Sequence, residues 1–131
     1  MSETTVDSRT SQKILIIEDE GEMCLVLNIL LIDEDIGLDH VKNLSAAEEY
    51  LAQELPSLII LDNKLPDGYG VDYMRHLKKK FSSIKIIMIS GFDASARDVA
   101  MENGADLFLE KPFTKEEFLT AIRSLLNIPE H

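Results

Sequence analysis

The stretch Leu58-Ile59-Ile60-Leu61-Asp62 decides the fold, because it joins four consecutive aliphatic residues to a carboxylate. An aliphatic run of strand length without polar alternation is typical of a strand that is covered on both faces. Two similar runs, 14–17 and 84–89, are separated from it by segments with helical spacing of apolar residues. A buried strand that ends in an acidic residue therefore stands at the centre of a predicted α/β domain.

Strand-like and helical segments alternate outward from this centre. Ser45 with Glu48 and Thr114 with Glu117 have the spacing of helix capping boxes, and Gly104 is placed to end a helix. Such alternation predicts right-handed crossovers and a doubly wound, flavodoxin-like parallel sheet of (βα)5 type with strand order 2-1-3-4-5. The predicted strands are 14–17, 38–44, 58–61, 84–89 and 107–109, and the predicted helices are 22–32, 45–54, 71–81, 94–103 and 114–127.

Length and composition limit the class of protein. The chain has 131 residues, 45% of them hydrophobic, which suits one globular domain, predicted at 13–128 after a flexible polar tail at 1–12. Its only cysteine, Cys24, excludes an internal disulfide and is expected to be a buried structural thiol. A formal net charge of −11 argues against direct binding of nucleic acid. No apolar run is long enough to span a membrane and no signal peptide is evident, so we expect a cytoplasmic protein.

Polar residues follow four of the predicted strands. The first strand ends in Glu18-Asp19-Glu20, the third in Asp62, the fourth in Ser90 and the fifth in Lys111. Each alone has a plain explanation, as a loop carboxylate, a turn former or a surface charge. In a doubly wound sheet, however, these strand ends share one edge, and ligands bind there. The set therefore predicts one pocket.

The chemistry of such a pocket is coherent. Crowded carboxylates repel one another, and a hard cation such as Mg²⁺ (or Mn²⁺) relieves that repulsion. A carboxylate can act as a nucleophile toward phosphorus and form an acyl phosphate. Lys111 and the hydroxyl of Ser90 would then supply positive charge and a hydrogen-bond donor to the phosphoryl oxygens.

Five motifs in order resemble the receiver domains of two-component response regulators over about residues 13–126. The motifs are Ile14-Leu15-Ile16-Ile17-Glu18-Asp19-Glu20, Leu58-Ile59-Ile60-Leu61-Asp62, Leu65-Pro66-Asp67-Gly68-Tyr69-Gly70, Ile87-Met88-Ile89-Ser90-Gly91 and Gly104-Ala105-Asp106-Leu107-Phe108-Leu109-Glu110-Lys111-Pro112-Phe113. The resemblance implies a phosphoacceptor module rather than an enzyme with a separate substrate. Its phosphoryl donor would be a phosphohistidine on a sensor histidine kinase or a histidine phosphotransfer protein.

The same resemblance implies a role for individual residues. Asp62 accepts the phosphoryl group, Lys111 pairs with it, and Ser90 hydrogen-bonds to it and moves inward on activation. Phe108 is the aromatic switch that turns inward with Ser90, so that the surface of the fourth helix, fifth strand and fifth helix changes. The Lys111-Pro112 bond is expected to be cis. The expected Mg²⁺ ligands are Glu18, Asp19, Asp62 and the backbone carbonyl of Lys64.

Several alternatives stay open at this point. Lys64, two residues after the acceptor, either alters the lifetime of the phosphoryl group or is a solvated lysine that contributes only its carbonyl. The first alternative function is a phosphohydrolase of the haloacid-dehalogenase type. That family usually has a second Asp two residues after its nucleophile, and the presence of Lys64 there counts against it. A receiver-like interaction module that is never phosphorylated would be expected to have lost Asp62, the acidic pair or Lys111, and all of these are present. A flavodoxin-type redox domain needs a phosphate-binding loop after the first strand. The acidic stretch Glu18-Asp19-Glu20 stands there and would repel a phosphate, which counts against this alternative.

Output from the domain also has two interpretations. Receivers of winged-helix regulators often form dimers through salt bridges between an Asp-Asp pair on the fifth strand and a basic residue on the last helix. In this chain the pair reads Asp106-Leu107 and the basic position is Ala121, so that dimer is not expected. The chain ends about where a receiver ends. Either it acts on a separate output protein, or an effector domain is missing from it.

Overall fold

The computed structural model of the protein describes residues 12–32, 34–91 and 94–127. The predicted N-terminal tail lies outside these residues except for Gln12, which already belongs to the first strand. The elements in chain order are β1 Gln12–Ile17, α1 Glu22–Leu30, β2 Ile36–Val41, α2 Leu44–Leu51, β3 Leu58–Asp62, β4 Lys64–Leu65, β5 Gly68–Tyr69, α3 Gly70–Lys80, β6 Lys85–Ser90, α4 Ala94–Glu102, β7 Leu107–Glu110 and α5 Lys115–Leu126.

The main sheet has five parallel strands in the order β2-β1-β3-β6-β7. This confirms the predicted doubly wound topology, since β6 and β7 are the fourth and fifth long strands. Strands β4 and β5 form a separate antiparallel hairpin directly after β3, in a segment predicted only as turn-rich. The order changes direction between β1 and β3, so their carboxyl ends frame the position where such sheets bind ligands.

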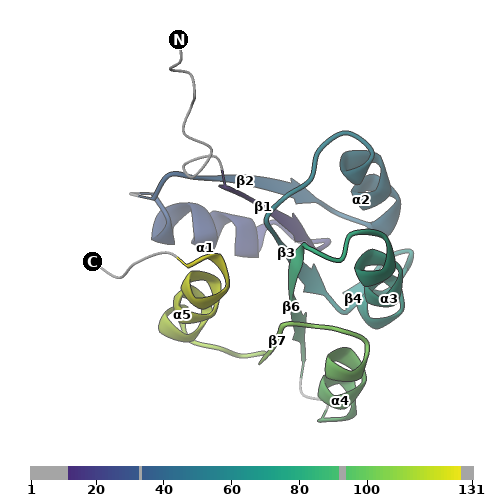
Figure 1. Ribbon diagram of the computed structural model, residues 1–131. Coiled ribbons are helices and arrows are strands. Elements are labelled where there is room, and N and C mark those ends of the chain that lie inside the picture. Colours follow the sequence, from purple (N-terminus) through teal and green to yellow (C-terminus); the bar gives the residue numbers. More distant parts are fainter. Residues whose placement is uncertain (1–11, 33, 92–93, 128–131) are drawn as a thin grey trace.

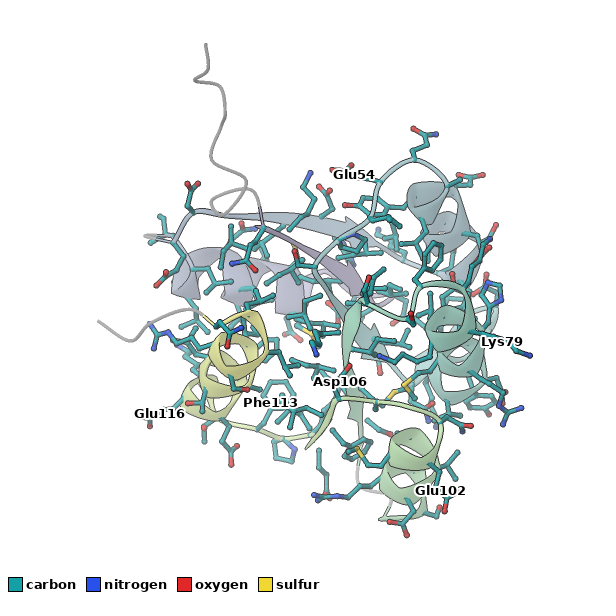
Figure 2. The ribbon with its side chains drawn as sticks, viewed as in Figure 1. Glu54, Lys79, Glu102, Asp106, Phe113 and Glu116 are labelled. Atoms are coloured by element: carbon teal, nitrogen blue, oxygen red, sulfur yellow. The ribbon has the colours of Figure 1, made fainter. Side chains whose placement is uncertain are left out.

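Two hydrophobic cores lie on opposite faces of the sheet. Alternate residues of β3 divide between them: Ile59 and Leu61 pack toward α2, α3 and α4, whereas Leu58 and Ile60 pack toward α1 and α5. Figure 1 shows these two helical layers on either side of the strands, and Figure 2 shows side chains filling both interfaces. Each fully buried aliphatic side chain contributes about 1.5–3 kcal/mol, so this sandwich rigidly fixes the strand ends.

Helix ends agree with the sequence in part. Thr114 and Glu117 form the predicted capping box at α5, and Gly104 adopts φ 107° after α4, a conformation that favours glycine. The capping box predicted at Ser45 is wrong. The helix begins one residue earlier, at Leu44, and the side chain of Asn43 accepts a hydrogen bond from Ala46 N instead.

Within the part of the chain that the structure describes, no helix combines the length and the apolar character needed to cross a membrane. Cys24 is only partly buried on α1, against the expectation of a fully buried thiol, although it does pack against the α1 and α5 core.

Candidate functional site

The carboxyl edge of the sheet holds a cavity of about 490 Å³. Five of the six predicted acceptor, phosphoryl-binding and metal residues line it: Asp19, Asp62, Lys64, Ser90 and Lys111. They come from the ends of β1, β3, β6 and β7 and from the start of the hairpin. Glu20, Asn63 and Gly91 complete the lining. The strand ends therefore meet in one polar cavity.

Asp62 and Lys111 form the charged centre of this cavity. The Asp62 residue is only 8% exposed, and its Oδ2 atom lies 3.4 Å from Lys111 Nζ. The Lys111 backbone is fixed as well, because its N–H donates to the carbonyl of Ser90 at 2.8 Å. The ammonium, which is partly exposed, offers charge at the cavity surface while its strand stays in the sheet.

Glu18 occupies a different position from the other predicted ligands. It is 5% exposed, and its Oε1 atom accepts a hydrogen bond from Met23 N at the start of α1, at 3.1 Å. Burial raises the pKa of this carboxyl, while the Met23 N–H opposes the rise. Glu18 lines a neighbouring cavity of about 420 Å³ rather than the one around Asp62. Lys111 lines both cavities, so Glu18 lies next to the cavity around Asp62 without being part of its lining.

The backbone of Glu18 has a partner that the sequence did not indicate. Nε2 of His40, on β2, lies 2.8 Å from the Glu18 carbonyl, which accepts a hydrogen bond in the tautomer that carries a proton on Nε2. Glu18 N also donates to the carbonyl of Val41 at 3.1 Å. Strand β2 therefore holds the peptide that precedes Asp19, although no pattern in the sequence linked His40 to the site.

The two predicted switch residues lie on adjacent strands. Ser90 is 7% exposed at the end of β6 and pairs with Glu110 of β7. Phe108 is partly buried on β7, pairs with Met88, and packs against the core on the α2–α4 side. The Lys111-Pro112 peptide bond is cis, as expected from the family resemblance.

The loop after the acceptor is closed by Asn63, which the sequence did not single out. The Asn63 carbonyl accepts from Gly70 N at 2.7 Å, and its Oδ1 accepts from Val71 N at 3.1 Å. Its own N–H donates to the carbonyl of Ile89 at 2.9 Å. Asn63 thus caps α3 and ties the loop to β6. No capping pattern in the sequence indicated this role, because Asn63 lies seven residues before the start of α3.

Oxygen donors at the site suit a hard cation. Among the residues that the structure describes, no three acidic, histidine or cysteine side chains form a metal site by themselves. Mg²⁺ keeps several waters, however, and is commonly bound by one or two carboxylates. Asp19 and Asp62 line one cavity with Lys64, whose backbone carbonyl is the further ligand predicted from the family resemblance. This donor set fits Mg²⁺ with water completing its coordination.

Together these features define a doubly wound α/β domain with a buried, lysine-paired carboxylate at the switch point of its sheet. The chain belongs to the response regulator receiver domain family, whose model matches residues 14–123. Response regulators are the signalling proteins of two-component systems, and their receiver domains interact with histidine kinases and output domains.

Individual relatives agree with this assignment. The chain is 39% identical over 121 residues to a probable transcriptional regulator ycf27 of Porphyridium aerugineum, covering 88% of this chain and 48% of that protein. The signal receiver domain of a putative LuxO repressor protein from Vibrio parahaemolyticus has a TM-score of 0.82 at 25% identity, covering 89% and 91% of the two chains. The beryllofluoride-activated NtrC4 receiver domain dimer has a TM-score of 0.81 at 31% identity, covering 88% and 96%. The chain spans about half the length of the curated relatives it matches.

Proposed function

We propose that this receiver domain accepts a phosphoryl group on Asp62 and acts as a phosphorylation-controlled switch. The observation that carries the proposal is the pairing of a nearly buried carboxylate, Asp62, with the Lys111 ammonium at 3.4 Å in a cavity that also holds Asp19. A nucleophile, a second carboxylate and a fixed positive charge are the groups that phosphoryl transfer to a carboxylate requires.

The reaction is an exchange of bonds at phosphorus. An Asp62 oxygen forms the new P–O bond while the P–N bond of a phosphohistidine breaks, and the donor imidazole leaves with the electron pair of that bond. Lys111 pairs with a phosphoryl oxygen, and the Ser90 hydroxyl donates to another. Asp19, Asp62 and the carbonyl of Lys64 would hold Mg²⁺, with Glu18 acting through water, and the bound cation would supply positive charge to the phosphoryl oxygens.

The proposed donor is a histidine kinase or a histidine phosphotransfer protein, which fits the family of the chain. We place the exchange in the cytoplasm, where response regulators typically work. The chemistry of the domain is limited to its own phosphorylation and dephosphorylation.

Phosphorylation adds about −1.5 to −2 charges to a rigid edge of the sheet. Ser90 moves toward the new group, and Phe108 turns into the space that Ser90 leaves. The surface of α4, β7 and α5 changes as a result and controls an output domain or a separate partner protein. Relatives that are transcriptional regulators are about twice as long as this chain, which is consistent with an output domain in those proteins.

Intact mass spectrometry after incubation with acetyl phosphate and Mg²⁺ tests the proposal. We expect one added phosphoryl group on the wild-type chain and none on Asp62→Asn, which keeps the size of the side chain. Omitting Mg²⁺ should also prevent the addition. Equal phosphorylation of wild type and Asp62→Asn would place the acceptor elsewhere and refute the assignment.

A further inference from the structure

We infer that Asp67 is a positioning residue for the phosphoryl-acceptor site and acts through the β4–β5 hairpin that carries Lys64. The inference deepens the proposed function and rests on it, because it concerns the proposed Mg²⁺ site. Asp67 does not line the cavity. Its influence is therefore structural, and reaches the cavity along the loop that follows Asp62.

Asp67 joins the tip of the hairpin to the beginning of α2. Its two carboxylate oxygens accept hydrogen bonds from Leu44 N at 2.9 Å and from Ser45 N at 3.0 Å, across more than twenty residues of sequence. The Leu44 N–H bond is the main reason that the pKa of the Asp67 carboxyl is lowered. A helix N-terminus leaves such N–H groups without intrahelical partners, and here a carboxylate from a distant loop satisfies two of them.

Close packing reinforces this contact. Gly68 adopts φ 154°, and a Cβ atom added there would lie 2.9 Å from Leu44 Cδ1. The tip of the hairpin is therefore pressed against the same residue whose N–H donates to Asp67. At its other end, the loop is held by Asn63, which bonds to Gly70, Val71 and Ile89.

Lys64 lies between these two anchors. It pairs with Tyr69, and Leu65 pairs with Gly68, in a hairpin of only two residues on each side. So short a ribbon is marginally stable by itself and takes its position from its anchors. Releasing Asp67 from α2 would let the hairpin shift and carry the Lys64 carbonyl away from Asp62. The proposed Mg²⁺ site would then lose part of its preformed geometry.

Asn43 provides a matched control within the same helix terminus. Its side chain accepts from Ala46 N at 2.7 Å, so it caps α2 beside the two N–H groups that Asp67 caps. Asn43 belongs to the β2–α2 connection and not to the hairpin. Asn43→Ala therefore weakens α2 without releasing Lys64, whereas Asp67→Ala weakens α2 and also frees the hairpin.

Isothermal titration of the full chain with MgCl₂ tests the inference on wild type, Asp67→Ala, Asp67→Asn and Asn43→Ala. We expect Asp67→Ala to bind Mg²⁺ about tenfold more weakly, as when a metal ligand loses an outer partner, and Asn43→Ala to stay within about twofold of wild type. Asp67→Asn keeps one amide oxygen as acceptor and should lie between them. Thermal unfolding should show similar destabilisation by the two alanine variants.

Either of two results overturns the inference while leaving the proposed function intact. One is a wild-type Mg²⁺ affinity for Asp67→Ala, or for Asp67→Asn if the alanine variant does not fold. The other is an equal loss of affinity in Asp67→Ala and Asn43→Ala, which would trace the effect to α2. Failure of the wild-type chain to bind Mg²⁺ would instead refute the proposed metal site, and this inference with it.

Coupling between two positions is reciprocal, which gives a second measurement. If the Mg²⁺ site and the Asp67 contact support each other, adding Mg²⁺ to the wild-type chain should slow amide hydrogen exchange at Leu44 and Ser45. Ala46, whose N–H is capped by Asn43, should respond less. Unchanged exchange at Leu44 and Ser45 in saturating Mg²⁺ would contradict the coupling.

Discussion

The Lys111 ammonium lies 3.4 Å from Oδ2 of Asp62 and reaches past β6 to do so, because β6 lies between β3 and β7 in the sheet. The short parallel strand β7 ends beside Ser90, so the lysine that follows it is directed across the end of β6. Ser90 ends β6, the strand that lies between those leading to the acceptor and to the lysine. A phosphoryl group on Asp62 would therefore meet a charge and a hydroxyl from two successive strands.

Replacing Lys111 with Met should slow phosphorylation strongly and leave the fold intact. Met keeps an apolar side chain of similar length but removes the charge that stabilises the phosphoryl oxygens, a loss worth about 10²-fold in rate. Stability should change by less than about 1 kcal/mol, because the ion pair is partly exposed. The measurement is the initial rate of phosphorylation by acetyl phosphate. Lys115→Met, outside the cavity, should react at the wild-type rate, and a normal rate for Lys111→Met would contradict the assigned role.

Gly70→Ala should destabilise the domain and disturb the acceptor. A Cβ atom at Gly70 would lie 2.6 Å from the Asp62 carbonyl oxygen and 3.1 Å from Leu61 Cγ, so backbone would have to move. Overpacking of this kind costs about 1–3 kcal/mol. Urea unfolding should show that loss, together with slower phosphorylation. Gly21→Ala is the control, because nothing lies within 4 Å of a Cβ there; equal stability of the two variants would show that the loop adapts.

The fold was predictable because three strongly aliphatic runs marked the central strands β1, β3 and β6, and only the run of β6 is interrupted, by Lys85. Prediction was poorest at β2, which was placed at 38–44 and lies at Ile36–Val41. This edge strand is half-buried and includes Gly37, Asp39 and His40, so its apolar signal is weak. The β4–β5 hairpin was missed since strands of two residues have no periodicity to detect.

The site was predictable as far as it depends on strand ends. Asp19, Asp62, Ser90 and Lys111 meet because parallel strands deliver their last residues to one edge. Contacts that depend on tertiary packing were not predictable. Asp67 caps a helix that begins 23 residues earlier, and Glu18 turns its carboxylate to α1 rather than to the cavity. Neither of these contacts produces a pattern in the linear sequence.

Glu48→Gln should destabilise the domain at neutral pH. The Glu48 carboxylate on α2 accepts hydrogen bonds from Tyr73 OH and from His76 Nε2 on α3, and the Tyr73 bond is the main reason that its pKa is lowered. We expect a loss of about 0.5–1 kcal/mol, since the group is partly exposed. Thermal unfolding at pH 7 measures it, and Glu49→Gln on the same helix should have a smaller effect.

The pH dependence of this difference has a definite sign. A carboxyl with a lowered pKa stabilises the folded state above the pKa of the unfolded chain, and this stabilisation is lost as pH falls through the folded pKa. The difference in free energy of unfolding between wild type and Glu48→Gln should therefore be largest at neutral pH and should disappear below about pH 4. Tyr73→Phe, which removes the main donor, should show the same narrowing. A stability difference that stays constant with pH would mean that the charge of the Glu48 carboxylate does not contribute to the stability of the fold.

Lys64→Ala should shorten the lifetime of the phosphoryl group on Asp62. Lys64 is exposed and lines the cavity beside the acceptor, so its ammonium can pair with a phosphoryl oxygen and stabilise the acyl phosphate. An exposed pair is worth up to about 1 kcal/mol, which corresponds to an increase of about two- to fivefold in the rate of autodephosphorylation. The decay of the phosphorylated species, followed by intact mass after removal of acetyl phosphate, gives this rate. Lys79→Ala is the control, because Lys79 points away from the sheet on α3 (Figure 2). Identical decay of wild type and Lys64→Ala would leave Lys64 as a solvated lysine that contributes only its backbone carbonyl.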